Sequence, residues 1–191
     1  IRDPEMSRVL GYVYKRQVLV NSYSDKLPSV LSDNRKGAYL AGRYLIEHGH
    51  KTVALLAGVR SYLSNQERTA GFLQAFQEEG LSIPPELILE TGSWLYDAAE
   101  KVCLNFFNTY TGEMPTALFA FNDRLATGAI NAICKTGRTV PDDVSVIGYD
   151  NLGYYNIISP RITTVETHIE AISELSLIHI SEPTRHLRIS Y

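Results

Sequence analysis

Residues 116–150, TALFAFNDRLATGAINAICKTGRTVPDDVSVIGYD, carry the clearest signal of the fold class. Its apolar run at 116–121 has the length and composition of a buried strand, and residues 122–136 follow with apolar side chains at helical spacing. A second apolar run occupies residues 144–148. A strand, a helix and a second strand joined by short connections are typical of a βαβ unit, in which the two strands lie parallel in one sheet.

The same alternation continues through the middle of the chain. Strand-like runs lie at 18–20, 29–31, 52–57, 87–89 and 162–165. Three amphipathic helical segments lie between them: one begins after Asp33, one contains Phe72 and one contains Val102. Repeated βαβ units predict the α/β class, with a parallel sheet covered by helices on both faces.

The composition is that of a globular chain without an excess of either charge. Of 191 residues, 45% are hydrophobic, and 18 Lys plus Arg stand against 21 Asp plus Glu, for a net charge of −3. The sequence therefore has no excess of positive charge that would indicate binding of nucleic acid. No window of about 20 residues lacks charges and turn residues, which excludes a membrane span. Two cysteines cannot build a disulfide framework, so we expect a reducing, cytoplasmic location.

The two ends of the chain do not continue the pattern of the middle. Residues 1–17 show no sustained period, and Pro183 would break a helix within residues 176–191. The strings VYKRQ and SLIHISEPTR resemble translated sequencing-adapter read-through, although genuine irregular tails would look similar. We therefore expect 1–17 and 176–191 to be non-native segments.

Four side chains follow predicted strands and are candidates for binding a ligand, because ligands of parallel sheets lie beyond the carboxyl ends of the strands. Arg68 supplies a planar fork of donors, and Asp150 supplies two acceptor oxygens. Asn122 offers donors and an acceptor, and Trp94 a flat apolar face. Carboxylate and guanidinium can grip adjacent hydroxyls while a ring covers a C–H face, so the set fits a small polyhydroxylated ligand.

Each of these four residues also has a purely structural interpretation. Arg68 could be an ordinary surface charge of a helix, and Trp94 could be a core residue. Asn122 could serve only as the N-cap of its helix, and Asp150 could only hydrogen-bond a loop.

Enzyme and cofactor motifs are absent from the sequence. No G-x-G-x-x-G follows a strand, and neither G-x-x-x-x-G-K-[ST] nor G-x-S-x-G occurs. His48 and His50 flank Gly49 without further ligands nearby, which favours complementation of a helix dipole over metal binding. We therefore expect a binding protein rather than an enzyme, with no cofactor, metal or catalytic residue.

Several ordered motifs carry a family resemblance. They are DNRKGA at 33–38, ERTAGF at 67–72, PTA at 115–117, NDRLATGA at 122–129, VPDDVSVIGYD at 140–150 and PRITTV at 160–165. In this order, over nearly all of residues 18–174, the chain resembles the LacI/GalR family of bacterial transcription regulators.

The resemblance implies a periplasmic-binding-protein-like fold, with two lobes of parallel βαβ units and an effector in the cleft between them. Residues 18–50 would then be a truncated N-terminal lobe, 51–158 a complete C-terminal effector-binding lobe, and 159–175 a crossover and the start of a returning helix. In this family an N-terminal helix-turn-helix reads operator DNA as a dimer, and the effector shifts operator affinity. The chain has no such headpiece, so we expect operator DNA to be bound only through that missing part.

By position, the resemblance implies effector contacts at Arg68, Asn122 and Asp150, with Trp94 walling the cleft. Asn21 falls where a polar residue of the first lobe faces the effector. The expected effector is a small sugar or nucleoside-like molecule.

Two other functions share part of this pattern. A sugar-binding protein of a transport system has the same fold and cleft chemistry, and its gene would encode a signal peptide upstream. An α/β enzyme such as a sugar-nucleotide transferase would need a phosphate-cradling loop or a carboxylate cluster for a metal, and neither is visible. The motifs at 140–150 and 160–165 favour the regulator.

The apolar run Tyr154, Tyr155, Ile157 and Ile158 predicts a homodimer contact, because a monomer would leave a contiguous apolar patch in water. The resemblance implies a two-fold dimer that uses this region; alternatively, the tyrosines only cover the edge of the sheet. We predict that Ile157→Asp weakens the dimer of the parent protein and spares effector binding, because it buries a charge in the contact. Sedimentation velocity measures this, and an unchanged dimer would move the interface elsewhere.

Overall fold

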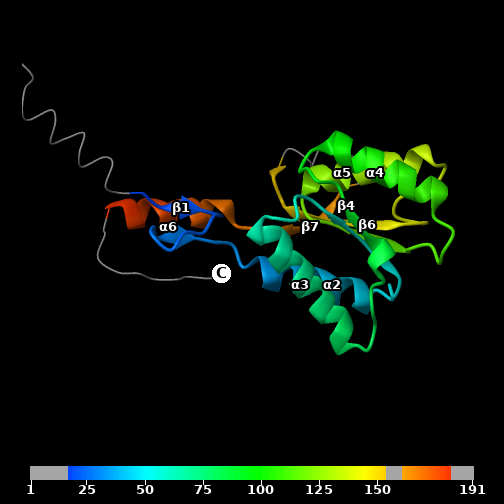
Figure 1. Ribbon diagram of the computed structural model, residues 1–191, viewed down its shortest axis with the longest axis horizontal. Helices are drawn as coiled ribbons and strands as arrows, with labels where there is room; N and C mark the ends of the chain where they lie inside the picture. The colour runs from blue at the N-terminus through cyan, green and yellow to red at the C-terminus, as the bar shows by residue number, and fades with distance from the viewer. Residues whose placement is uncertain (1–16, 154–160, 182–191) are drawn as a thin grey trace, which may run out of the picture. The chain divides into compact units, whose positions relative to one another are not determined.

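The computed structural model describes residues 17–153 and 161–181, which divide into two compact units (Figure 1). Unit 2 comprises Asn34–Thr167, and unit 1 comprises the described residues on either side of it. The predicted dimer residues Tyr154, Tyr155, Ile157 and Ile158 lie outside the described residues, so that interface stays a prediction.

Unit 2 is built on a five-stranded parallel sheet. Its strands are β3 (Val53–Ala57), β4 (Ile88–Glu90), β5 (Ala117–Ala120), β6 (Ser145–Asp150) and β7 (Thr163–Glu166). They lie in the order β4-β3-β5-β6-β7, and every neighbouring pair is parallel. The chain leaves β3 toward one edge and returns past it to β5, so the order reverses between β3 and β5. Ligands of such sheets bind outside the carboxyl ends of the strands at that reversal.

Two helix layers bury this sheet, as the sequence predicts. Helices α2 (Asn34–Glu47) and α3 (Leu63–Glu78) lie on one face, and α4 (Tyr96–Thr109) and α5 (Asp123–Lys135) on the other (Figure 1). A 3-10 turn, Pro85–Leu87, leads into β4. Every residue of β3 and β5 is buried, which explains their unbroken apolar runs.

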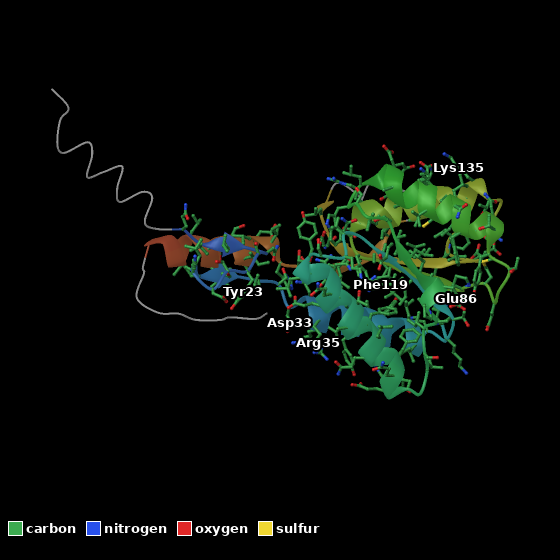
Figure 2. All side chains as sticks on the ribbon, viewed as in Figure 1. Tyr23, Asp33, Arg35, Glu86, Phe119 and Lys135 are labelled. Carbon is green, nitrogen blue, oxygen red and sulfur yellow. The ribbon has the colours of Figure 1, made fainter. Side chains whose placement is uncertain are left out.

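The core joins the sheet to the α2–α3 layer through aromatic rings. Phe119 of β5 stacks on Phe72 of α3 with ring centroids 4.8 Å apart, and both side chains are fully buried. Figure 2 shows Phe119 inside the unit, with Arg35 and Lys135 on the outer sides of the two helix layers. Each large buried ring removes enough apolar surface from water to contribute several kcal/mol, roughly, to folding.

Unit 1 contains a two-stranded parallel sheet and one helix. Strand β1 (Leu19–Val20) pairs with β2 (Ser29–Val30), and α6 (Ile169–Ser181) packs on both strands. Within the described residues, no helix combines the length and apolarity needed to cross a bilayer.

The helical pattern is expected to end before residue 176, but α6 runs to Ser181. The helix can continue because Pro183 lies beyond its last residue. Ile172 and Ser176 are both buried, so the buried face of α6 continues past residue 175, where the pattern was expected to end. The Ser176 hydroxyl donates to the Ile172 carbonyl at 2.7 Å.

The expected lobe boundaries at 50 and 158 stay predictions, and the two compact units divide the chain at other places, between residues 33 and 34 and between residues 167 and 168. Helix α2, predicted within the N-terminal segment 18–50, packs on α3 inside unit 2. The Tyr39 hydroxyl donates to Glu78 at 2.7 Å, and the Arg35 guanidinium donates to Gln74. Strand β7, predicted within the crossover 159–175, pairs with β6 as the edge strand of the same sheet. The hydrophobic period shows that an element has a buried face but does not reveal what covers it.

The close approach of α2 to α3 depends on glycine. A Cβ added at Gly71 would clash with the main-chain oxygen of Arg35, and one at Gly42 would lie 2.8 Å from the Ala75 Cβ. Backbone cannot give way as a flexible side chain can, so Gly71 has no tolerated larger replacement without a shift of α2.

We predict that Gly71→Ala destabilises the chain by roughly 1–3 kcal/mol, the usual cost of overpacking. Urea unfolding followed by circular dichroism measures the change. Ala70→Ser is the matched control, because Ala70 is exposed one position earlier on the same helix and should change stability by less than about 0.5 kcal/mol. Equal effects of the two substitutions would contradict the packing account.

Candidate functional site

Arg68, in the second turn of α3, carries a buried guanidinium at the carboxyl end of the sheet. Only 7% of the residue is exposed. Its Nε donates to the Asn34 side-chain oxygen at 2.9 Å, and Nη1 donates to the main-chain oxygen of Phe121. Its Nη2 donates to Asp150 Oδ1 at 3.2 Å. Because an unpaired buried charge costs several kcal/mol, roughly, these three acceptors hold the guanidinium in one place.

Tyr149 lies beneath this guanidinium. The Arg68 Cζ is 3.6 Å from the centroid of the Tyr149 ring, which is a cation–π contact. Tyr149 is 2% exposed, and its ring approaches α2 at Gly37, where a Cβ would clash with the Tyr149 hydroxyl. The missing side chain at position 37 therefore lets the ring fit under the arginine.

Asp150 ends β6 in a backbone conformation that favours glycine. Its φ is +100°, and Asn151 follows with φ of +51°. Non-glycine residues held in this region carry strain, and such residues concentrate at functional sites. The carboxyl is mostly buried, and burial raises its pKa to about 6, while the Arg68 guanidinium lowers it and the Asp123 carboxylate raises it.

Asn122 has the structural role considered for it, and its effector contact stays a prediction. It is the N-cap of α5, where its Oδ1 accepts a hydrogen bond from the Leu125 N–H at 2.7 Å. Its Nδ2 donates to the main-chain oxygen of Trp94 at 3.5 Å. One half of the amide therefore begins a helix, and the other half contacts the loop after β4.

Trp94 presents a half-buried indole close to the end of β3. A Cβ at Gly58 would lie 2.5 Å from the Trp94 Cε3, so only glycine fits under the ring. The Gly58 N–H donates to the Asn65 side-chain oxygen at 2.9 Å, which fixes this turn. The Tyr62 ring, 55% exposed, stands 6.1 Å from the indole. Two aromatic rings thus line the end of β3.

Asn21 belongs to unit 1. Its side-chain oxygen accepts hydrogen bonds from the Ser32 N–H at 3.2 Å and from the Ser32 hydroxyl at 3.1 Å. Its φ is +50°, as in a turn. These hydrogen bonds give Asn21 a structural role within unit 1, where it joins the ends of β1 and β2. Its effector contact stays a prediction.

The structure brings Arg68 to Asp150 and Asn122 to the Trp94 backbone, all within unit 2. The burial of Arg68 excludes the interpretation of this residue as an ordinary surface charge. Three residues of the site were not among the candidates from sequence: Asn34, Tyr149 and Asp123. Tyr149 looks like a strand core residue and Asn34 like a helix cap, so only their places directly beside a strand end could have indicated a role.

The two histidines of unit 2 form hydrogen bonds, and one of its two cysteines is buried. His48 Nδ1 is 2.7 Å from the Tyr44 carbonyl, and His50 Nδ1 is 2.9 Å from the Thr116 hydroxyl. Burial raises the pKa of the Cys103 thiol to about 12, which keeps it a packing residue, whereas Cys134 is exposed. Within residues 17–153 and 161–181, no three His, Cys, Asp or Glu side chains gather as a metal site.

With this geometry in place, similarity to known proteins identifies the family. The sequence profile of the periplasmic binding protein-like domain matches residues 43–177. The HTH-type transcriptional repressor PurR of Vibrio parahaemolyticus is 41% identical over 142 residues, which cover 74% of this chain and 42% of that protein. The chain belongs to the LacI/GalR family, in the part that folds as a periplasmic-binding-protein-like domain. A probable HTH-type transcriptional repressor ExuR of Bacillus subtilis is 35% identical over 82% of this LacI/GalR chain and 47% of its own length.

Solved structures of LacI-family regulators share the fold. A regulator from Mycobacterium smegmatis superposes with a TM-score of 0.83 at 24% identity, covering 96% of this chain and 68% of that one. A sugar-binding regulator from Escherichia coli, complexed with phosphate, gives a TM-score of 0.79 at 26% identity, covering 97% and 69%. This LacI/GalR chain spans less than half the length of the curated repressors that it matches.

The raised pKa of Asp150 gives a prediction about stability. The folded chain holds this proton more tightly than the unfolded chain, so Asp150 lowers the stability progressively as the pH rises from 3.8 to about 6. Asp150→Asn cannot titrate and should remove that loss. Relative to the native chain, the variant should gain roughly 1–3 kcal/mol across this pH range.

Urea unfolding at pH 4 and pH 7 provides the measurement. Asp97→Asn serves as the control, because Asp97 is exposed in the first turn of α4. Parallel stability profiles for the native chain and Asp150→Asn would contradict the burial of this carboxyl.

Proposed function

We propose that this chain is the effector-binding part of a DNA-binding transcription repressor, and that a small sugar or nucleoside-like molecule binds at the carboxyl ends of β3, β5 and β6. The observation that carries the proposal is the buried Arg68 guanidinium paired with Asp150 where the strand order reverses. This is the place where parallel sheets bind ligands.

The chemistry of the surrounding groups supports a ligand rich in hydroxyls. Asp150 accepts hydrogen bonds, Arg68 donates them, and the Asn122 amide does both. The Trp94 and Tyr62 rings supply flat apolar surface for the C–H face of a ring or for stacking on a base. The Escherichia coli structural relative is a sugar-binding regulator, which agrees with this chemistry.

The regulatory role is supported by the relatives. The curated proteins from Vibrio parahaemolyticus and Bacillus subtilis are transcriptional repressors of the HTH type. By analogy, operator DNA would be bound through a helix-turn-helix encoded upstream of this stretch, in a homodimer, and Asn21 would add an effector contact.

The sequence of the parent gene upstream of the codon for Val18 tests the role directly, because residues 1–17 are expected to be non-native. A helix-turn-helix segment continuous with this chain supports the repressor. A signal peptide there would instead make the chain part of a sugar-binding protein of a transport system and would overturn the proposal.

The assignment of the site predicts a loss of affinity in Arg68→Ala. The effector is found first by screening pentoses, hexoses, hexuronates and nucleosides against the parent protein. The substitution should then weaken its binding by roughly 2–5 kcal/mol, because polar groups of ligand and site lose a charged partner. Isothermal titration calorimetry measures the change.

Two further variants make this test decisive. Arg43→Ala is the matched control, because Arg43 lies nine residues along α2 from Asn34, away from the strand ends, and its guanidinium pairs with Glu79 and Glu47. Asp150→Asn tests the same site if Arg68→Ala does not fold. Unchanged affinity in both site variants would reject the assignment.

A further inference from the structure

Asp123 is a buried carboxylate for which the proposed ligand contacts give no role. It is the first residue of α5 and is 2% exposed. Burial raises its pKa, against the hydrogen bonds that it accepts. A carboxylate is held in such a place only when its oxygens are fully occupied, so its partners indicate what it does.

One oxygen of Asp123 holds the loop that follows β6. Its Oδ2 accepts the Leu152 N–H at 3.2 Å. Asp150, at the end of β6, and Asn151, at the start of the loop, both have left-handed φ angles, a strained conformation for residues other than glycine. Such a conformation persists only where neighbouring groups impose it, and the Asp123 carboxylate is one of those groups.

The other oxygen of Asp123 holds strand β7. Its Oδ1 accepts the Thr164 hydroxyl at 2.5 Å. Thr164 is the register partner of Gly148 on β6, where a Cβ would clash with this same oxygen. Glycine at 148 therefore lets the carboxylate reach across β6 to β7. A second threonine acts nearby, since the Thr167 hydroxyl donates to the Asp150 carbonyl at 3.2 Å.

We propose that Asp123 is a positioning residue of the ligand site: by accepting hydrogen bonds from Leu152 and Thr164, it holds the left-handed loop that presents the Asp150 carboxylate to Arg68. The inference rests on the proposed function only in taking Asp150 as a ligand contact. The position of Asp150 can be measured without any ligand, so this inference and the proposed function fail separately.

The experiment uses the 191-residue chain and three threonine variants. Thr164→Val keeps the shape of the side chain and removes the hydroxyl, and Thr164→Ser restores the hydroxyl. Thr163→Val is the matched control, one position earlier on β7 with an exposed side chain. The readout is the pKa of the Asp150 carboxyl from carbon-13 NMR titration, with Asp150→Asn identifying its signal.

Thr164→Val should shift the pKa of Asp150 by at least about 0.5. A rise means that the carboxylate leaves Arg68, and a fall means that it moves toward water; both support the proposal. Thr164→Ser and Thr163→Val should leave the value near that of the native chain. A purely structural role of Asp123 would lower the melting temperature of Thr164→Val without moving this pKa, and that result overturns the proposal.

A second measurement tests Asp123 itself. Asp123→Ala removes both acceptors, so the Leu152 amide hydrogen should exchange at least about tenfold faster than in the native chain. The Leu125 amide, held by Asn122 on the same turn of helix, is the internal control. Unchanged exchange at Leu152 would show that another group holds the loop and would overturn the proposal.

Discussion

A buried guanidinium must find an acceptor for its N–H groups, and the region of unit 2 where we propose that a ligand binds is organised around that requirement at Arg68. The acceptors come from three different elements: Asn34 at the start of α2, Phe121 at the end of β5, and Asp150 at the end of β6. Tyr149 supports the cation from below. A helix layer and two strand ends therefore meet at one charge, where the strand order reverses.

Close approach of backbone to side chain makes this arrangement possible. Gly58 lets the Trp94 indole lie against the end of β3, and Gly148 lets the Asp123 carboxylate reach across β6. An alanine Cβ at Gly58 would clash with the Trp94 indole, and one at Gly148 would clash with the Asp123 carboxylate. Glycine at these two positions thus allows the close contacts by leaving the volume of a side chain open.

The sequence predicts the elements of this fold well because their hydrophobic periods are strong and their ends are marked by caps and glycines. It also predicts that Arg68 and Asp150 lie at the same edge of the sheet, since polar groups after parallel strands meet there; their contact with a ligand stays a prediction. It does not show that α2 packs in unit 2, because an apolar stripe does not identify the element that it packs against. Gly42 on α2 and Gly71 on α3, where the two helices approach closely, were the available signal. The contact of Tyr149 with the Arg68 guanidinium was not predicted, because a buried aromatic residue in a strand resembles an ordinary core residue.

Its three acceptors hold the Arg68 guanidinium in place without a ligand. Hydrogen exchange of the arginine side-chain N–H groups, followed by nitrogen-15 NMR on the ligand-free chain, measures this. We expect the Arg68 Nε–H and Nη–H groups to exchange slowly, because acceptors occupy all three nitrogens, whereas Arg60, exposed in the loop before α3, exchanges as fast as a free arginine. Exchange at Arg68 as fast as at Arg60 would show that these acceptors do not hold the guanidinium.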